Sequence, residues 1–170
     1  MNWIIREATE ADAARLIAYM DELAQEPDVA LPLRPGTFQI TLEQEREWIR
    51  QHNEQDNALL LLVEAQGEIV GVLHCQGSPD LFTRHNVTMG VSLRRDYRGR
   101  GIGTQLIRRC LDWARSKGYI RRVQLEVFSY NEEAIQLYER LGFETEGWRI
   151  QAYYIDDHYV DTYLMSQQIA

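Results

Sequence analysis

The feature that most constrains this chain is a glycine-rich loop directly ahead of an amphipathic helix. The loop reads Arg98-Gly99-Arg100-Gly101-Ile102-Gly103, and the pattern predicts a helix over 101–117. Glycines leave the backbone bare, so several N–H groups are able to converge on an anion. The helix adds unpaired N–H groups and the positive end of its dipole at the same point. The loop therefore predicts a site for a diphosphate, with the charges of Arg98 and Arg100 beside it.

Length and composition narrow the class of protein. At 170 residues the chain is expected to form one domain over 1–170. The net charge of −8 argues against a nucleic-acid surface as the main partner. There is no signal-peptide core and no apolar run near membrane-spanning length, so we expect a cytoplasmic protein with no membrane partner. Cys75 and Cys110 lie in apolar segments without metal-type spacing, which predicts buried free thiols and no metal site.

The first half of the chain predicts alternating strands and helices. Thr9 is expected to cap a helix over 12–24, and Thr41 with Gln44 forms a capping box for a helix over 42–52 that buries Leu42. The segment between these helices, 25–40, contains all four prolines and is predicted to be irregular. Strands are expected over 3–6, 58–65, 68–76 and 86–93, the second and third as a hairpin.

The second half predicts one further helix and a closing hairpin. A strand is expected over 122–128, and Asn131 is expected to cap a helix that Gly142 closes. The tail reads as an antiparallel hairpin with strands over 148–154 and 159–165. Gly118 is expected to end the helix that follows the glycine loop. The chain contains no repeat and no linker, in agreement with one domain.

Two common nucleotide motifs do not fit the loop. A P-loop needs Gly-Lys-Ser/Thr, and Gly103-Thr104 lacks the lysine. A dinucleotide fingerprint needs three glycines after a tight turn, and Gly99-x-Gly101-x-x-Thr104 has two of them. The polar connection over 94–97 is also too long for that turn. The pattern therefore favours neither interpretation.

A third pattern fits two separate parts of the chain. Arg98-x-x-Gly101-x-Gly103 resembles the first signature of the GCN5-related N-acetyltransferase family. About 28 residues later, Asn131-x-x-Ala134-x-x-x-Tyr138-x-x-x-Gly142-Phe143 is similar to the second signature of that family. The order of the predicted elements is also that of the family. The closing segments over 142–147 and 159–165 are similar to small bacterial members that acetylate amino acids or related amines.

The resemblance implies a fold and a cofactor. The fold would be mixed α/β, with three αβα layers and a central mixed, mostly antiparallel sheet whose strands splay after 93 and 128. Acetyl-CoA would lie where they splay. The resemblance assigns its pyrophosphate to N–H groups of Arg98, Gly99, Arg100, Gly101, Ile102, Gly103 and Thr104, and its pantetheine to Val91, Ser92 and Leu93. Asn131 would bind the amide region of the cofactor, and Tyr138 would point at the sulfur.

Acyl transfer from a thioester requires a neutral amine, an acceptor for its proton and stabilisation of the oxyanion. An unpaired N–H near Val91 would supply the oxyanion contact. Spacing alone favours Tyr138 as a core residue, and only the full second signature makes it the proton donor to the departing thiolate. The identity of the general base stays open, because Thr88, Met89 and Gly90 carry no carboxylate at the positions where many relatives have one. The substitutes are Glu126, His74, His85 and a chain of water molecules.

The leading hypothesis is an acetyl-CoA-dependent N-acetyltransferase acting on the primary amine of a small molecule, such as an amino acid. One alternative acceptor is a protein N-terminus or lysine; another function is a non-catalytic acyl-CoA-binding module. In similar enzymes the proline-rich loop, with Leu33, Arg34 and Phe38, helps to wall the acceptor site. The tyrosines of the tail either line an amine pocket or cover the sheet; they are Tyr153, Tyr154, Tyr159 and Tyr163. A homodimer is a family-level expectation.

Overall fold

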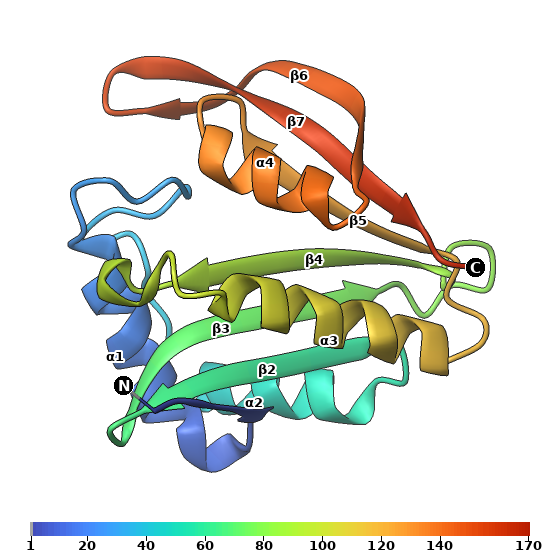
Figure 1. Cartoon of the computed structure of the whole chain (residues 1–170). Helices are drawn as coiled ribbons and strands as arrows, with labels where there is room; N and C mark the ends of the chain where they lie inside the picture. The colour runs from blue at the N-terminus through green and yellow to red at the C-terminus, as the bar shows by residue number, and fades with distance from the viewer. Residues whose placement is uncertain (1) are drawn as a thin grey trace.

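The computed structural model describes residues 2–170 and contains a seven-stranded mixed sheet between two layers of helices (Figure 1). The strand order is β1-β2-β3-β4-β5-β7-β6. The strands are β1 Ile4–Glu7, β2 Ala58–Ala65, β3 Glu68–Gly77, β4 Asn86–Leu93, β5 Arg122–Phe128, β6 Glu144–Ile155 and β7 His158–Gln168. The helices are α1 Ala13–Ala24, α2 Leu42–Glu54, α3 Ile102–Ser116 and α4 Glu132–Arg140, with short 3-10 turns at Glu10–Asp12 and Arg95–Tyr97. The predicted fold class is therefore confirmed.

The core has two parts, one on each face of the sheet. Strand β2 is apolar from Ala58 to Val63 because both of its faces are covered there. Its Leu60 and Leu62 pack with α1 and α2, and its Leu59 and Leu61 pack in the cluster that contains the inward face of α3. Cys75 and Cys110 are buried and free, as predicted. Within residues 2–170, no helix has the length and apolar character needed to cross a bilayer.

The predicted elements agree with the structure except at some ends. Residues 10–12 form a 3-10 turn before α1 begins, and the tail strands are longer than predicted. Thr41 and Gln44 form the predicted capping box. The expectation that α2 buries Leu42 is wrong: this side chain is 40% exposed, because the buried face of the helix begins one turn later, at Glu45.

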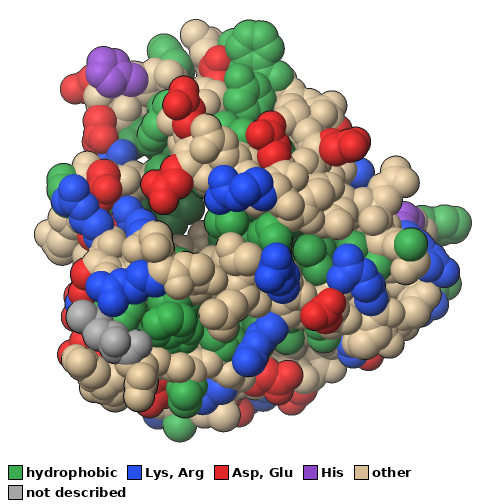
Figure 2. Space-filling model, in the orientation of Figure 1, with side chains coloured by type: hydrophobic (Ala, Val, Ile, Leu, Met, Phe, Trp, Pro, Cys, Tyr) green, Lys and Arg blue, Asp and Glu red, His purple; other side chains and the backbone are tan. Residues whose placement is uncertain are grey.

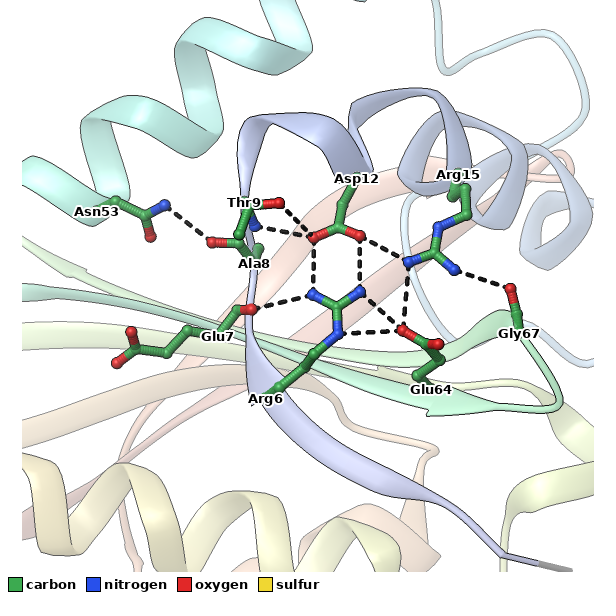
Figure 3. A network of polar contacts seen from close by, with 9 residues as sticks. All are labelled: Arg6, Glu7, Ala8, Thr9, Asp12, Arg15, Asn53, Glu64 and Gly67. Carbon is green, nitrogen blue, oxygen red and sulfur yellow. Dashed lines mark hydrogen bonds and ion pairs between the residues drawn. The ribbon is translucent and has the colours of Figure 1, made fainter.

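A network of ion pairs joins β1 to the start of α1 and to β2 (Figure 3). Arg6 on β1 donates to both oxygens of Asp12, at 2.8 and 2.7 Å, and also to Glu64 on β2. Arg15 on α1 binds the same two carboxylates. The Asp12 side chain is only 4% exposed. Its hydrogen bonds to Arg6 hold the pKa of the carboxyl well below its usual range.

We predict that Asp12→Asn destabilises the protein by about 2 kcal/mol at pH 7, between the values for exposed and buried ion pairs. The pKa of Asp12 is lowered on folding. Its contribution to the free energy of unfolding is therefore fully present above the pKa of the unfolded chain, about 3.9, and is lost progressively as the pH falls below that value. Urea unfolding from pH 7 to pH 3 measures both effects. The difference from wild type should shrink below pH 4.

Asp21→Asn is the matched control, because Asp21 lies on the same helix and has no ion pair among residues 2–170. It should change the unfolding free energy by less than about 0.5 kcal/mol. Equal effects of the two substitutions would contradict the account of the network.

Candidate active site

Strands β4 and β5 form a wedge, because they are paired along only part of their length. Their parallel register includes three partner pairs and ends at Thr88 with Gln124. Beyond this point β5 continues in antiparallel register with β7 as far as Phe128, while β4 stays with β3 as far as Leu93. The two halves of the sheet separate in Figure 1, and Figure 2 shows the surface hollowed beside the wedge. The splay occurs between the two strands for which it was expected.

The edge of β4 presents backbone groups to this wedge. The N–H of Arg94 donates to the carbonyl of Val70, so even-numbered residues of β4 bond to β3. The alternation of an antiparallel pair then directs the N–H and C=O of Val91 towards the side of β5. Val91 lies beyond the last β4–β5 partner pair, so these groups have no strand partner. The side chain of Ser92 lies on the α1 face, where its hydroxyl is 2.9 Å from that of Tyr19.

The glycine loop forms a turn with free N–H groups. Gly99 and Gly101 have φ values of +70° and +79°, and a Cβ at either position would meet nothing within 4 Å. Packing therefore does not require glycine there, whereas the left-handed backbone does. Among residues 2–170, no hydrogen-bond acceptor is found for the N–H groups of residues 99–104. Positive φ values at Gly99 and Gly101 alternate with a negative φ at Arg100. A turn with this alternation directs successive N–H groups to one point, as anion-binding nests do.

The two arginines of the loop differ in their contacts. The guanidinium of Arg98 donates to the carbonyl of Leu93 at 3.0 Å and pairs with Glu26 and Asp28. Its N–H donates to the carbonyl of Arg95. Arg98 thus makes its contacts within this chain, and a role of Arg98 towards the phosphates stays a prediction. Arg100 stacks on the Tyr97 ring at 5.5 Å and has no carboxylate partner among residues 2–170.

Helix α3 is anchored directly behind the loop. Ile102 is 1% exposed and packs in the core, so the first turn is fixed in place. A Cβ at Gly103 would lie 3.4 Å from the Leu137 side chain of α4 and 3.8 Å from that of Leu93. These are ordinary van der Waals distances, so the first turn of α3 lies directly beside α4 and the end of β4. Thr104 is partly exposed on the same turn.

Helix α4 places Asn131 and Tyr138 on the β5 side of the wedge. Asn131 caps the helix, and its Oδ1 accepts from the N–H of Ala134 at 3.3 Å, which leaves its amide NH2 group to donate elsewhere. The Tyr138 ring is 8% exposed and packs on Phe143. No partner for the Tyr138 hydroxyl is found among residues 2–170. Burial raises the pKa of Tyr138 to about 12, so it is protonated at neutral pH.

The three side chains considered as bases lie in different places. Glu126 on β5 accepts from Thr162 and from Arg149, each at 2.8 Å. His74 on β3 lies opposite Gly90 of β4. His85 precedes β4, at the end where β4 and β5 are still paired, so it is remote from the wedge.

The proline-rich segment is tied to the tail hairpin. Arg34 binds Asp156, in the β6–β7 turn, through its Nε and through Nη2 at 2.8 Å. Its Nη1 donates to the carbonyls of Leu31 and Leu33. Leu33 itself is buried. This pairing joins segments far apart in sequence, and no sequence signal marked it.

The tail tyrosines differ in their packing. Tyr154 and Tyr159 are exposed and stack on each other, with ring centroids 5.0 Å apart. Tyr153 packs on Phe128, and Tyr163 is partly buried against the core.

Comparisons with known proteins agree with this geometry. A family model described as "Acetyltransferase (GNAT) family" matches residues 13–143. The chain is 36% identical over 89 residues to "Probable N-acetyltransferase camello" of Xenopus tropicalis, but spans only 40% of that protein. It is 28% identical over 148 residues to the L-methionine sulfoximine/L-methionine sulfone acetyltransferase of Pseudomonas aeruginosa, covering 86% of this chain and 83% of the relative.

A solved structure is similar over almost the full length. The crystal structure of the acetyltransferase of GNAT family from Streptococcus pneumoniae has a TM-score of 0.94 at 30% identity, covering 99% of this chain and 100% of that one. The splayed strands, the glycine loop and the matched family model lead to the same conclusion. The chain belongs to the acetyltransferase (GNAT) family, which uses acetyl-CoA.

Proposed function

We propose that this protein is an acetyl-CoA-dependent N-acetyltransferase that acetylates the primary amine of a small molecule, such as an amino acid or a related amine. The observation that carries the proposal is the set of unpartnered N–H groups over 99–104, which lies beside the wedge between β4 and β5. A diphosphate matches these donors in charge and in number of acceptors. The free N–H and C=O of Val91 match the amides of an extended pantetheine chain.

Acetyl-CoA supplies the acetyl group as a thioester. On this chain, the N–H groups of residues 99–104 and the Arg100 guanidinium hold the diphosphate. The N–H of Val91 is the oxyanion donor, and the free NH2 of Asn131 reaches the cofactor amides. The Tyr138 hydroxyl, which has no protein partner and stays protonated, is suited to give its proton to the sulfur.

The choice of a small acceptor is supported by the contact between the proline-rich segment and the tail hairpin. The Arg34–Asp156 contact connects the 25–40 segment to the β6–β7 turn. A protein N-terminus or lysine would need an open groove at this place. Similarity to the methionine sulfoximine/sulfone acetyltransferase agrees with a small amine.

The direct test is a panel of amines, amino acids and peptides assayed for release of free CoA thiol. Turnover with small amines and none with peptides supports the proposal. Turnover with peptides alone would show that the acceptor is a protein N-terminus or lysine. Binding of acetyl-CoA with no turnover across the panel would favour an acyl-CoA-binding module.

We predict that Gly101→Ala weakens acetyl-CoA binding about tenfold. A side chain at φ +79° costs about 1–2 kcal/mol in the left-handed region, and relief of that strain turns the N–H groups away from their common point. Isothermal titration calorimetry measures the affinity. Gly118→Ala is the matched control, because Gly118 has φ +73° and open space at the other end of α3. Gly118→Ala should have the same cost in stability and an unchanged affinity for acetyl-CoA. Equal losses of affinity in the two variants would refute the role of the N–H groups of residues 99–104 in binding.

We predict that Tyr138→Phe lowers kcat about 100-fold and leaves the acetyl-CoA Kd within about twofold. The ring and its contact with Phe143 are retained, and only the hydroxyl is lost. Tyr119→Phe is the control, because the pKa of Tyr119 is also raised to about 12, but this residue lies beyond the C-terminal end of α3. Unchanged turnover in Tyr138→Phe would assign Tyr138 to core packing alone.

A further inference from the structure

His74 occupies a row of residues that crosses the sheet at the start of the wedge. It pairs with Gly90 on β4, which lies two residues beyond Thr88, the last β4 residue with a partner on β5. The side chain of Gln124 donates to that of Thr88 at 3.0 Å, so these two share a face. Since side chains alternate, Gly90 and Glu126 lie on that same face, on opposite sides of the opening.

The imidazole of His74 leans over β4. A Cβ added at Gly90 would lie 2.3 Å from Nε2 of His74 and 2.9 Å from its Cε1. Only glycine at position 90 leaves room for this ring. The ring therefore lies above the β4 backbone, one residue from Val91, whose N–H faces the wedge.

His74 keeps its hydrogen-bonding capacity free. Neither of its ring nitrogens has a partner among residues 2–170, and the side chain remains accessible to solvent. Its ring contacts are with Trp48, at 5.9 Å between centroids, and with His52, at 6.3 Å. A polar side chain without a partner, crowded at the edge of an opening, is typical of groups that meet a ligand.

The surroundings of His74 keep it neutral. Loss of hydration against the packed protein, followed by the nearby His52, lowers the pKa of His74 below its ordinary value. His52 on α2 holds Nδ1 2.9 Å from the carbonyl of Trp48, so Nδ1 carries hydrogen and the buried Nε2 is an unpartnered acceptor. On β4 this face presents Thr88, Gly90 and Ser92, none of them charged.

Glu126 on β5 is the carboxylate on this face, and both of its oxygens are engaged. One accepts from Thr162 and the other from Arg149. Both oxygens of Glu126 therefore already accept hydrogen bonds from this chain. Of Glu126 and His74, only His74 keeps a ring nitrogen without a hydrogen-bond partner among residues 2–170.

We propose that Nε2 of His74 accepts the proton that the acceptor amine releases during acetyl transfer; this rests on the proposed function. The amine arrives neutral, and its nitrogen bonds to the acetyl carbon as the bond from that carbon to sulfur breaks. One proton leaves the nitrogen for Nε2 of His74, and one passes from the Tyr138 hydroxyl to the thiolate. The imidazolium then loses its proton to solvent, and Tyr138 regains one. The nitrogen becomes strongly acidic once it is bonded to the acetyl carbon, so a weak base suffices.

The test compares variants of the full chain with the best amine of the panel. His74→Ala should lower kcat about 100-fold, keep the acetyl-CoA Kd within twofold, and regain activity with added imidazole. Gly90→Ala should also lower kcat, because the new methyl group displaces the ring while the base remains. His85→Gln should match wild type, since His85 is remote from the wedge. Melting temperatures and acetyl-CoA affinities establish that each variant is folded.

Near wild-type turnover in His74→Ala, or a loss that imidazole does not relieve, would overturn the role of His74. A larger loss in Glu126→Gln together with retained activity in His74→Ala would assign the base to Glu126. Failure of wild type to acetylate any amine of the panel is a different result, because it refutes the proposed function itself.

Discussion

The early end of pairing between β4 and β5 is the constraint on which this structure depends. After Thr88 and Gln124, β5 follows β7 and β4 follows β3, so one edge of each strand lies open in the middle of a sheet. Backbone N–H and C=O groups in such a position are costly unless something pairs with them. Most proteins avoid this arrangement in the centre of a sheet. Here the opening is kept, and α3 and α4 lie along its two sides (Figure 1).

The glycine loop and the wedge are the two parts of the proposed binding surface, and only residues 94–101 separate the end of β4 from the start of α3. The buried Ile102 fixes the first turn of α3, and Gly103 on the same turn lies beside Leu137 of α4 and Leu93 of β4. Arg98 holds the segment between β4 and α3 in place through its hydrogen bond to the Leu93 carbonyl and its ion pairs with Glu26 and Asp28. These contacts hold the loop donors in place, and preorganised donors of this kind lose little entropy on binding.

The sequence predicts most elements and the loop, because these depend on local signals. Turn glycines, capping residues and strand alternation act over a few residues, and they place the helix ends at Gly118 and Gly142 correctly. The ion pairs of Arg98 and Arg34 could not be predicted, since their carboxylate partners lie 70 to 122 residues away. The same holds for His74, because its register with Gly90 and the position of its ring above the β4 backbone appear only in the folded sheet.

The most direct measurement of the central claim is a titration of the 15N-labelled protein with coenzyme A, followed by the backbone amide resonances. The account predicts that the largest shifts fall on residues 99–104 and on Val91, whose N–H groups lack partners in the free protein. Saturable binding that leaves those resonances in place and moves others would contradict it.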